Sequence, residues 1–209
     1  MQTFSPASGQ EFNFFTEKLA TWNGWLASLV IDQNGLTVGH DGTSKTVGNQ
    51  TDLQLLIALR SKASLIVTTG KTARIEQYKP SRFAPIAFIS RNQSSLANIP
   101  AVNTPGSNPN LFLSSSKPLH EAFNDFDKEL SVAGFNNFLF EGGLESVAAL
   151  SQSTHPFTLV LSIANAQDFD EAYAHELLNK ILPECSSPQL QEAFGVGPNL
   201  VTIWTKPAN

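Results

Sequence analysis

Short, continuous apolar runs separated by polar and glycine-bearing segments dominate the hydrophobic pattern of this chain. Runs of this length without apolar–polar alternation predict strands that are covered on both faces. They cover residues 25–31, 64–68, 85–89, 111–113, 136–140 and 157–163, and a last strand is predicted at 199–205. Stretches with helical spacing stand between them, at 51–60, 118–132, 144–150 and, in an acidic segment, 167–182. This order predicts an α/β fold on a mostly parallel central sheet with an antiparallel C-terminal edge.

The first 24 residues differ in character, because Ser, Pro and Gly are mixed there with aromatic residues. Phe12, Phe15 and Leu19 stand at a rough helical spacing. We therefore expect an N-terminal arm over residues 1–24, with a short helix. A single domain is expected over 25–209, a length that one large domain can fill.

Charge and composition exclude several classes of partner. The formal net charge of −5 argues against nucleic acid, which is held mainly by Lys and Arg contacts to phosphate. No apolar run has the length of a membrane span, and the first ten residues lack the basic start and apolar core of a secretory signal. The single cysteine, Cys185, cannot form an internal disulfide. We expect a cytoplasmic protein without membrane or nucleic-acid partners.

Polar or glycine-bearing segments follow four of the predicted strands. In an open α/β sheet, ligands bind at the carboxyl ends of the strands. The four segments are Asp32, Thr69–Gly70, Ser90–Arg91 and Glu141–Gly143. The sequence therefore predicts one crevice that these segments share.

The last of these segments belongs to a strand, Gly-Gly, helix stretch over residues 138–150. Such a turn presents free backbone N–H groups at the positive end of a helix, and Gly142 and Gly143 let an anion approach closely. A plain tight turn explains the glycines equally well. Glu141 either contacts the ligand or braces the turn.

Each of the other segments also has two readings. One interpretation is that a ring or a phosphate contacts the hydroxyls and bare backbone of Thr69, Gly70 and Thr72. The alternative is that Thr69 caps a helix. The spacing of a nucleotide-triphosphatase loop is absent there. The hydroxyl of Ser90 and the guanidinium of Arg91 could bind a phosphate ester. The alternative is that Arg91 is a solvated loop residue. Asp32 orients a substrate or relays a proton, or it forms a turn at the strand end.

Other catalytic patterns are missing from the sequence. The four histidines and Cys185 have no metal-ligand spacing, so we predict no metal site. No serine stands in a G-x-S-x-G elbow. Cys185 has no evident nearby base, and a buried or incidental thiol is the favoured interpretation.

Several of these motifs occur in a familiar order. They are Gly42-Thr43-Ser44, Asp52 followed by Leu59-Arg60-Ser61-Lys62-Ala63, Ile66 to Arg74, Pro85 to Ile89, and Phe140-Glu141-Gly142-Gly143. This order, over roughly residues 25–205, resembles the reductase domain of bacterial riboflavin biosynthesis, the RibD C-terminal family. The resemblance implies a three-layer dihydrofolate-reductase-like fold and a homodimer.

The resemblance also implies an NADPH-dependent reductase. It places Thr69, Gly70 and Thr72 along the cofactor, Glu141 to Gly143 at its phosphates, and Ser90 and Arg91 at its 2′-phosphate. The residues implied to face the substrate are Gly42, Thr43, Ser44 and the helix that carries Asp52. The substrate would be a small heterocycle or ribosylated pyrimidine, with 5-amino-6-ribosylamino-pyrimidinedione phosphate as one candidate.

The chain departs from the family pattern at two places. The turn after the first strand is longer, Asp32-Gln33-Asn34-Gly35, and the zinc motifs of the paired deaminase domain are absent.

Asp32 and Asp52 are the candidates for a catalytic proton-donating role. The alternative function is a non-catalytic protein that binds a nucleotide or a pterin-like ligand on the same scaffold.

Overall fold

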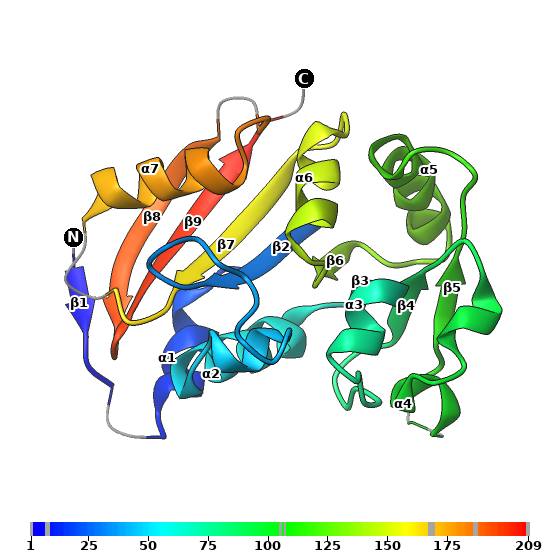
Figure 1. Cartoon of the computed structure of the whole chain (residues 1–209), viewed down its shortest axis with the longest axis horizontal. Coiled ribbons are helices and arrows are strands. Elements are labelled where there is room, and N and C mark those ends of the chain that lie inside the picture. Colours follow the sequence, from blue (N-terminus) through cyan, green and yellow to red (C-terminus); the bar gives the residue numbers. More distant parts are fainter. Residues whose placement is uncertain are drawn as a thin grey trace.

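The computed structural model describes residues 2–6, 9–104, 106, 108–166, 170–185 and 188–207. Within them, nine strands form one sheet in the order β1-β8-β9-β7-β2-β6-β3-β4-β5 (Figure 1). The strands are β1 Gln2–Phe4, β2 Gly24–Ile31, β3 Leu65–Thr69, β4 Ile86–Ile89, β5 Leu111–Leu113, β6 Asn137–Phe140, β7 Phe157–Ile163, β8 Gln189–Val196 and β9 Asn199–Lys206. The α-helices are α1 Glu11–Lys18, α2 Gln50–Lys62, α3 Gly70–Ile75, α4 Pro100–Asn103, α5 Leu119–Val132, α6 Leu144–Gln152 and α7 Glu171–Ile181.

The sheet is parallel except at β9, which runs antiparallel to both β7 and β8. The predicted α/β class, with a mostly parallel sheet and antiparallel pairing on the C-terminal side, is therefore confirmed. The seven predicted strands all form, and β1 and β8 are strands that the sequence pattern did not predict. Part of the predicted helix over 167–182 forms as α7, while residues 167–169 lie outside the described residues.

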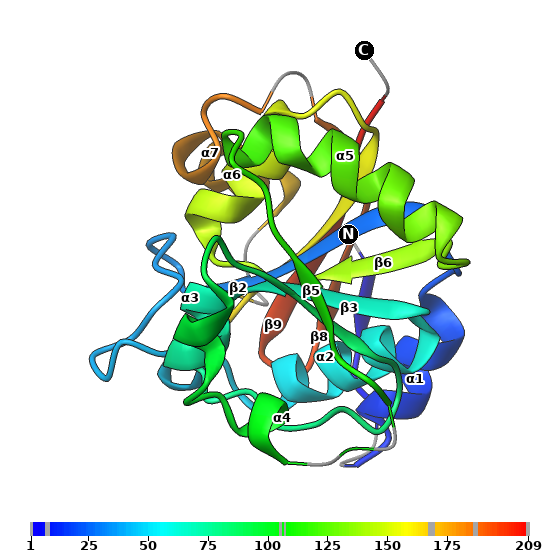
Figure 2. The same ribbon diagram turned by 90° about the vertical axis from the view of Figure 1, so that its right-hand side faces the viewer.

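Helices cover both faces of the sheet and give the fold three layers (Figures 1 and 2). On one face, Phe123 and Phe126 of α5 and Leu150 of α6 pack against inward side chains of the central strands. On the other face, Leu55 and Leu59 of α2 are buried in a second hydrophobic core. Strands buried on both faces explain why the sequence shows continuous apolar runs rather than alternation.

The segment predicted as an N-terminal arm contributes elements to this fold. Strand β1 pairs in parallel with β8, from Gln2 opposite Phe194 to Phe4 opposite Val196. Helix α1 contacts α2, and its Phe15 is fully buried in the second core. Among the described residues, no helix is both long and apolar enough to cross a bilayer.

Candidate functional site

Two strand-to-helix turns meet at the carboxyl edge of the sheet, and Thr72 joins them. The backbone N–H of Gly143, in the turn from β6 to α6, donates to Thr72 Oγ1 at 3.1 Å. In the turn from β3 to α3, Thr69 caps the helix by accepting the N–H of Thr72, also at 3.1 Å. The structure thus brings together the predicted cofactor residues Thr69, Thr72 and Gly143.

Gly142 and Gly143 have different roles in this turn. A Cβ on Gly142 would lie 2.4 Å from the Phe140 ring and 2.6 Å from Ser146 Oγ, so this glycine is required by packing. A Cβ on Gly143 would meet only Thr72 Oγ1, at 3.7 Å, an ordinary contact. Gly143 therefore leaves open space above the first turn of α6, whose leading N–H groups have no intrahelical acceptor.

Glu141 is buried below the turn and braces it. Arg60 donates two hydrogen bonds to its carboxylate, from Nε to Oε1 at 2.7 Å and from Nη2 to Oε2 at 2.5 Å. Tyr78 donates its hydroxyl to Oε2 at 2.7 Å, and Thr68 Oγ1 donates to the Glu141 carbonyl at 2.9 Å. This two-point contact is the geometry in which Arg binds carboxylates most strongly. In this structure the carboxylate is committed to the protein.

The electrostatics of this cluster fix its protonation states. Burial opposes the Arg60 charge, but the Glu141 carboxylate raises the pKa of Arg60 overall. Burial raises the pKa of Tyr78 well above its ordinary range, and the nearby negative charge of Glu141 raises it further. Arg60 is therefore a cation, Tyr78 a neutral donor, and the pair with Glu141 holds α2 against the end of β6.

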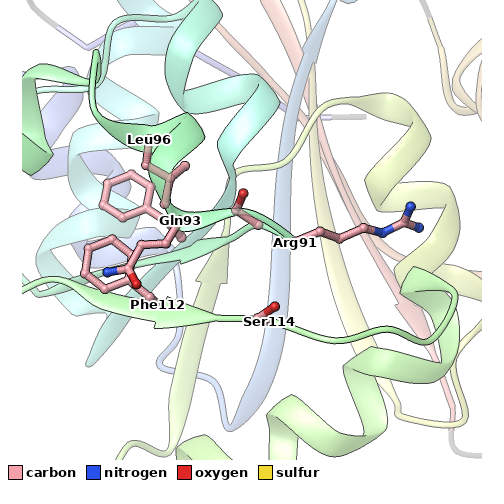
Figure 3. A pocket seen from close by; sticks show the side chains of 7 residues that line it. Arg91, Gln93, Leu96, Phe112 and Ser114 are labelled. Carbon is pink, nitrogen blue, oxygen red and sulfur yellow. The ribbon is translucent and has the colours of Figure 1, made fainter.

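Ser90 and Arg91 follow β4 and line a cavity of about 240 Å³. The cavity lies between the ends of β4 and β5, and it combines apolar and polar lining. Its other lining residues are Phe88, Gln93, Leu96, Phe112 and Ser114. Figure 3 shows the Arg91 side chain extending away from the group formed by Gln93, Leu96 and Phe112. Among the described residues, its exposed guanidinium has no hydrogen-bond or ion-pair partner.

Gly70, in the β3–α3 turn, lies directly against residues that line this cavity. A Cβ at Gly70 would lie 2.7 Å from Leu96 Cδ2 and 3.4 Å from Ser90 Cβ. Glycine permits this close approach, whereas a Cβ would require the Leu96 side chain to move. Three of the four predicted strand ends thus form one continuous surface.

Helix α2 carries a stripe of three residues one turn apart, Asp52, Leu56 and Arg60. Residues four apart lie on the same helix face, so the stripe spans about 12 Å at 1.5 Å per residue. Arg60 contacts the end of β6, and Asp52 lies at the other end of the stripe. Strand β2 extends past β6, which ends opposite Ala27, and its Ser28 and Val30 are only partly buried.

Asp52 belongs to a buried polar cluster at the start of α2. Its Oδ2 accepts the N–H of Asn49 at 2.7 Å, which completes a capping box. Asn49 is hydrogen-bonded to Asn199, and Asn199 Nδ2 donates to Ser162 Oγ at 3.3 Å. Within the described part of the chain, the buried Asp52 Oδ1 has no hydrogen-bond partner. Burial raises the pKa of Asp52 above its ordinary value, although the Ser162 and Asn199 side chains and the Asn49 N–H oppose this rise.

The loop with Gly42, Thr43 and Ser44 lies against the end of α3. The N–H of Ser44 donates to Glu76 Oε1 at 2.7 Å, which ties the loop to the end of α3. Asp41 organises the loop from within by accepting hydrogen bonds from both the N–H and the hydroxyl of Thr43. The Thr43 N–H first, then the hydroxyls of Thr46 and Thr43, lower the pKa of Asp41 to about 2.

Asp32 lies at the end of β2, five residues beyond the level of Phe140. At about 3.3 Å per residue, this places it roughly 16 Å past the end of β6. Its carboxylate accepts the N–H groups of Asn34 and Leu36, both at 2.8 Å. Partial burial raises its pKa, but these hydrogen bonds lower it overall. Asp32 thus holds a turn and stands apart from the Thr72–Gly143 contact.

Arg60, Tyr78 and Asn199 take part in the site, although the sequence did not single them out as site residues. One signal for Arg60 was available. A carboxylate directly after a buried strand requires a partner, and Arg60 ends the neighbouring helix. Tyr78 and Asn199 gave no comparable signal. Among the described residues, no group of three or more His, Cys, Asp or Glu could hold a metal ion.

Comparisons with known proteins agree with this architecture. No protein-family model matches the sequence, and no curated protein matches it significantly. Solved structures match in fold. A pyrimidine reductase-like protein from Corynebacterium diphtheriae has a TM-score of 0.61 and 18% identity, covering 93% of this chain and 97% of that chain. The chain has the fold of the pyrimidine reductases.

Two further structures support this statement. A deaminase/5-amino-6-(5-phosphoribosylamino)uracil reductase from Thermotoga maritima has a TM-score of 0.61 and 12% identity, covering 89% of this chain and 57% of that chain. The riboflavin biosynthesis reductase of Saccharomyces cerevisiae has a TM-score of 0.51 and 10% identity, covering 93% and 95%. The fold that the resemblance implied is confirmed.

Proposed function

We propose that this protein is an NADPH-dependent reductase of a small, pyrimidine-like heterocycle. The observation that carries the proposal is the Thr72–Gly143 contact. It joins two turns at the carboxyl edge of the sheet, where ligands of open α/β folds bind. The fold shared with solved pyrimidine reductases supports the same activity.

The residues at this edge suit NADPH. Gly143 and the first turn of α6 present backbone N–H groups and open space, which fit a pyrophosphate. The cavity beside Phe88 and Phe112 offers aromatic surface, and Arg91 supplies an uncompensated positive charge for a 2′-phosphate. NADPH, when bound, supplies the hydride, so the protein's task is orientation and electrostatics.

Asp52 is the candidate proton donor. Reduction of a C=N or C=C bond needs a proton as well as a hydride, and burial keeps the Asp52 carboxyl protonated at a higher pH than usual. Its buried Oδ1 makes no hydrogen bond among the described residues, and the Ser162 and Asn199 side chains beside the carboxyl partly offset the effect of burial on its pKa. Gly42, Thr43 and Ser44 are proposed to hold the substrate above it, because their loop is anchored to the end of α3.

A second candidate function is ligand binding without catalysis. The observation that favours it is the cover over Asp52, since a Cβ at Gly48 would lie only 3.3 Å from Asp52 Oδ2. Under this alternative the loop stays closed and the carboxyl never reaches a substrate.

Turnover separates the two functions. The loss of nicotinamide absorbance is followed with NADPH and a panel of aminopyrimidines, ribosylated pyrimidines and dihydropterins. Oxidation of NADPH that depends on one of these substrates, and that Asp52→Asn slows at least tenfold, supports the reductase. Saturable NADPH binding without oxidation across the panel supports the binding protein instead.

A further inference from the structure

We propose that the substrate of this site carries no phosphate ester and is a neutral or cationic nitrogen heterocycle. The inference rests on the proposed function and concerns the substrate end of the crevice. That end is formed by the loop over residues 36–48, the start of α2 and the end of α3. We call these segments the substrate wall.

Acidic side chains dominate the substrate wall. Asp41 lies in the loop, Asp52 in the first turn of α2, and Glu76 directly after α3. Contacts hold the three segments together, because Ser44 is bonded to Glu76 and Gly48 packs against Asp52. Asp32 adds a further carboxylate at the base of the loop, where it accepts the N–H of Leu36.

Asp41 is the most firmly ionised of these groups. Three hydrogen bonds converge on its carboxylate, from the Thr43 N–H at 2.9 Å, the Thr43 hydroxyl at 2.9 Å and the Thr46 hydroxyl at 2.8 Å. Donors aimed at a carboxylate favour its charged form. Asp41 therefore keeps a negative charge in the loop at any physiological pH.

Several cations of the neighbouring elements are already hydrogen-bonded within the protein. Arg60 lies on the same stripe of α2 as Asp52, but its Nε and Nη2 donate to the Glu141 carboxylate. Lys62 donates its Nζ to the Leu19 carbonyl at 2.6 Å, and Arg74 donates to the Ser95 carbonyl at 3.2 Å. Within the loop, Lys45 is the one Lys or Arg against the charge of Asp41.

A phosphate ester suits this surface poorly. It carries close to two negative charges near neutral pH and is held in proteins by Arg clusters or backbone N–H groups. Here it would face the carboxylates of Asp41 and Glu76, while Lys45 in the loop and Lys180, which donates to the Asn34 carbonyl at 2.9 Å, supply positive charge. A heterocycle with ring N–H or amino groups has the opposite chemistry, because carboxylates accept its hydrogen bonds. The Glu76 carboxylate, whose Oε1 already accepts the N–H of Ser44, is one such acceptor.

The test compares two ligands that differ only in the phosphate. They are 5-amino-6-(ribosylamino)uracil and its 5′-phosphate, titrated calorimetrically into protein saturated with NADP⁺. We expect the unphosphorylated compound to bind at least tenfold more tightly, which corresponds to about 1.4 kcal/mol. Raising the salt from about 50 to about 300 mM should narrow the gap, because screening weakens the repulsion. Equal or tighter binding of the phosphate ester overturns the inference.

Prior titration with NADP⁺ keeps the two proposals separate. If NADP⁺ binds and neither pyrimidine does, the substrate class is wrong while the cofactor site stands. If NADP⁺ does not bind, the proposed function has failed at its first step. The pyrimidines are then titrated without cofactor, and the same comparison between them still decides the charge preference of the wall.

A matched pair of variants locates the effect. Glu76→Gln removes one charge from the wall but keeps an acceptor for the Ser44 N–H. Asp125→Asn removes one charge from α5, where Asp125 is ion-paired with Lys117 on the opposite face of the sheet. We expect Glu76→Gln to reduce the discrimination between the two ligands about threefold and Asp125→Asn to leave it unchanged. An equal effect of both variants contradicts a local origin.

Discussion

The guanidinium of Arg60 and the carboxylate of Glu141 form a two-point contact, with Nε to Oε1 at 2.7 Å and Nη2 to Oε2 at 2.5 Å. The two residues are 81 positions apart in the chain. Glu141 is almost fully buried, and Tyr78 donates to the same carboxylate. This contact fixes the turn that holds Gly142 and Gly143, so the cofactor end of the crevice depends on it.

Removal of the Glu141 carboxylate should destabilise the fold. Glu141→Ala leaves Arg60 and Tyr78 without their partner, and we expect a loss of about 2–4 kcal/mol in the free energy of unfolding. Urea denaturation measures it. The matched control is Glu145→Ala, because Glu145 is 86% exposed and paired with the exposed Lys71. A control loss as large as that of Glu141→Ala would contradict a special role for the buried contact.

The two glycines of the turn should respond differently to alanine. Gly142→Ala forces a methyl group into the Phe140 ring and should cost about 1–3 kcal/mol of stability. Gly143→Ala has an ordinary φ of −71° and open space, so stability should change by less than about 0.5 kcal/mol. Its methyl would instead stand over the α6 N–H groups and weaken NADPH binding. Thermal unfolding and nicotinamide fluorescence, measured on both variants, separate these effects.

Arg91 should distinguish NADPH from NADH. Arg91→Ala removes an exposed cation at the cavity beyond β4, and we expect about tenfold weaker NADPH binding with NADH binding unchanged. Arg82→Ala is the control, since Arg82 lies over the Phe83 ring and does not line this cavity. An equal loss of affinity for both cofactors would contradict a contact between Arg91 and the 2′-phosphate.

Asp52 should make stability depend on pH with a defined sign. Burial raises its folded-state pKa above the ordinary value of 3.8. Such a carboxyl contributes stability below its unfolded pKa, and this contribution is lost as the pH rises through the folded pKa. Asp52→Asn keeps an acceptor for the Asn49 N–H but cannot ionise. The variant should therefore gain stability relative to the native protein as the pH rises from 4 towards neutrality, as denaturation at several pH values would show.

The fold was predictable where its elements are buried on both faces. The seven predicted strands form runs such as 25–31 and 157–163, whose apolar continuity follows from helices on both sides. Strand β8, Gln189–Val196, was missed because its first half is polar and partly exposed. Strand β1 has three residues and gains its conformation from pairing with β8, which no local pattern reveals.

The site was predictable only as far as strand ends reveal it. Because ligands bind at the carboxyl ends of parallel strands, the sequence predicted that Thr69, Ser90 and Gly143 lie at one edge of the sheet. Contacts between distant positions were beyond reach, because nothing local relates Thr72 to Gly143 or Asn49 to Asn199. The two readings of Asp32 could not be separated until its hydrogen bonds to Asn34 and Leu36 were visible.

The central claim is that the joined turns at Thr72 and Gly143 hold NADPH. The most direct test is a titration of the protein with NADPH and with NADH, followed by nicotinamide fluorescence. We predict saturable binding of NADPH, at least tenfold tighter than that of NADH and weakened by Gly143→Ala. Absence of saturable binding for both cofactors, or NADPH binding that Gly143→Ala leaves unchanged, would contradict it.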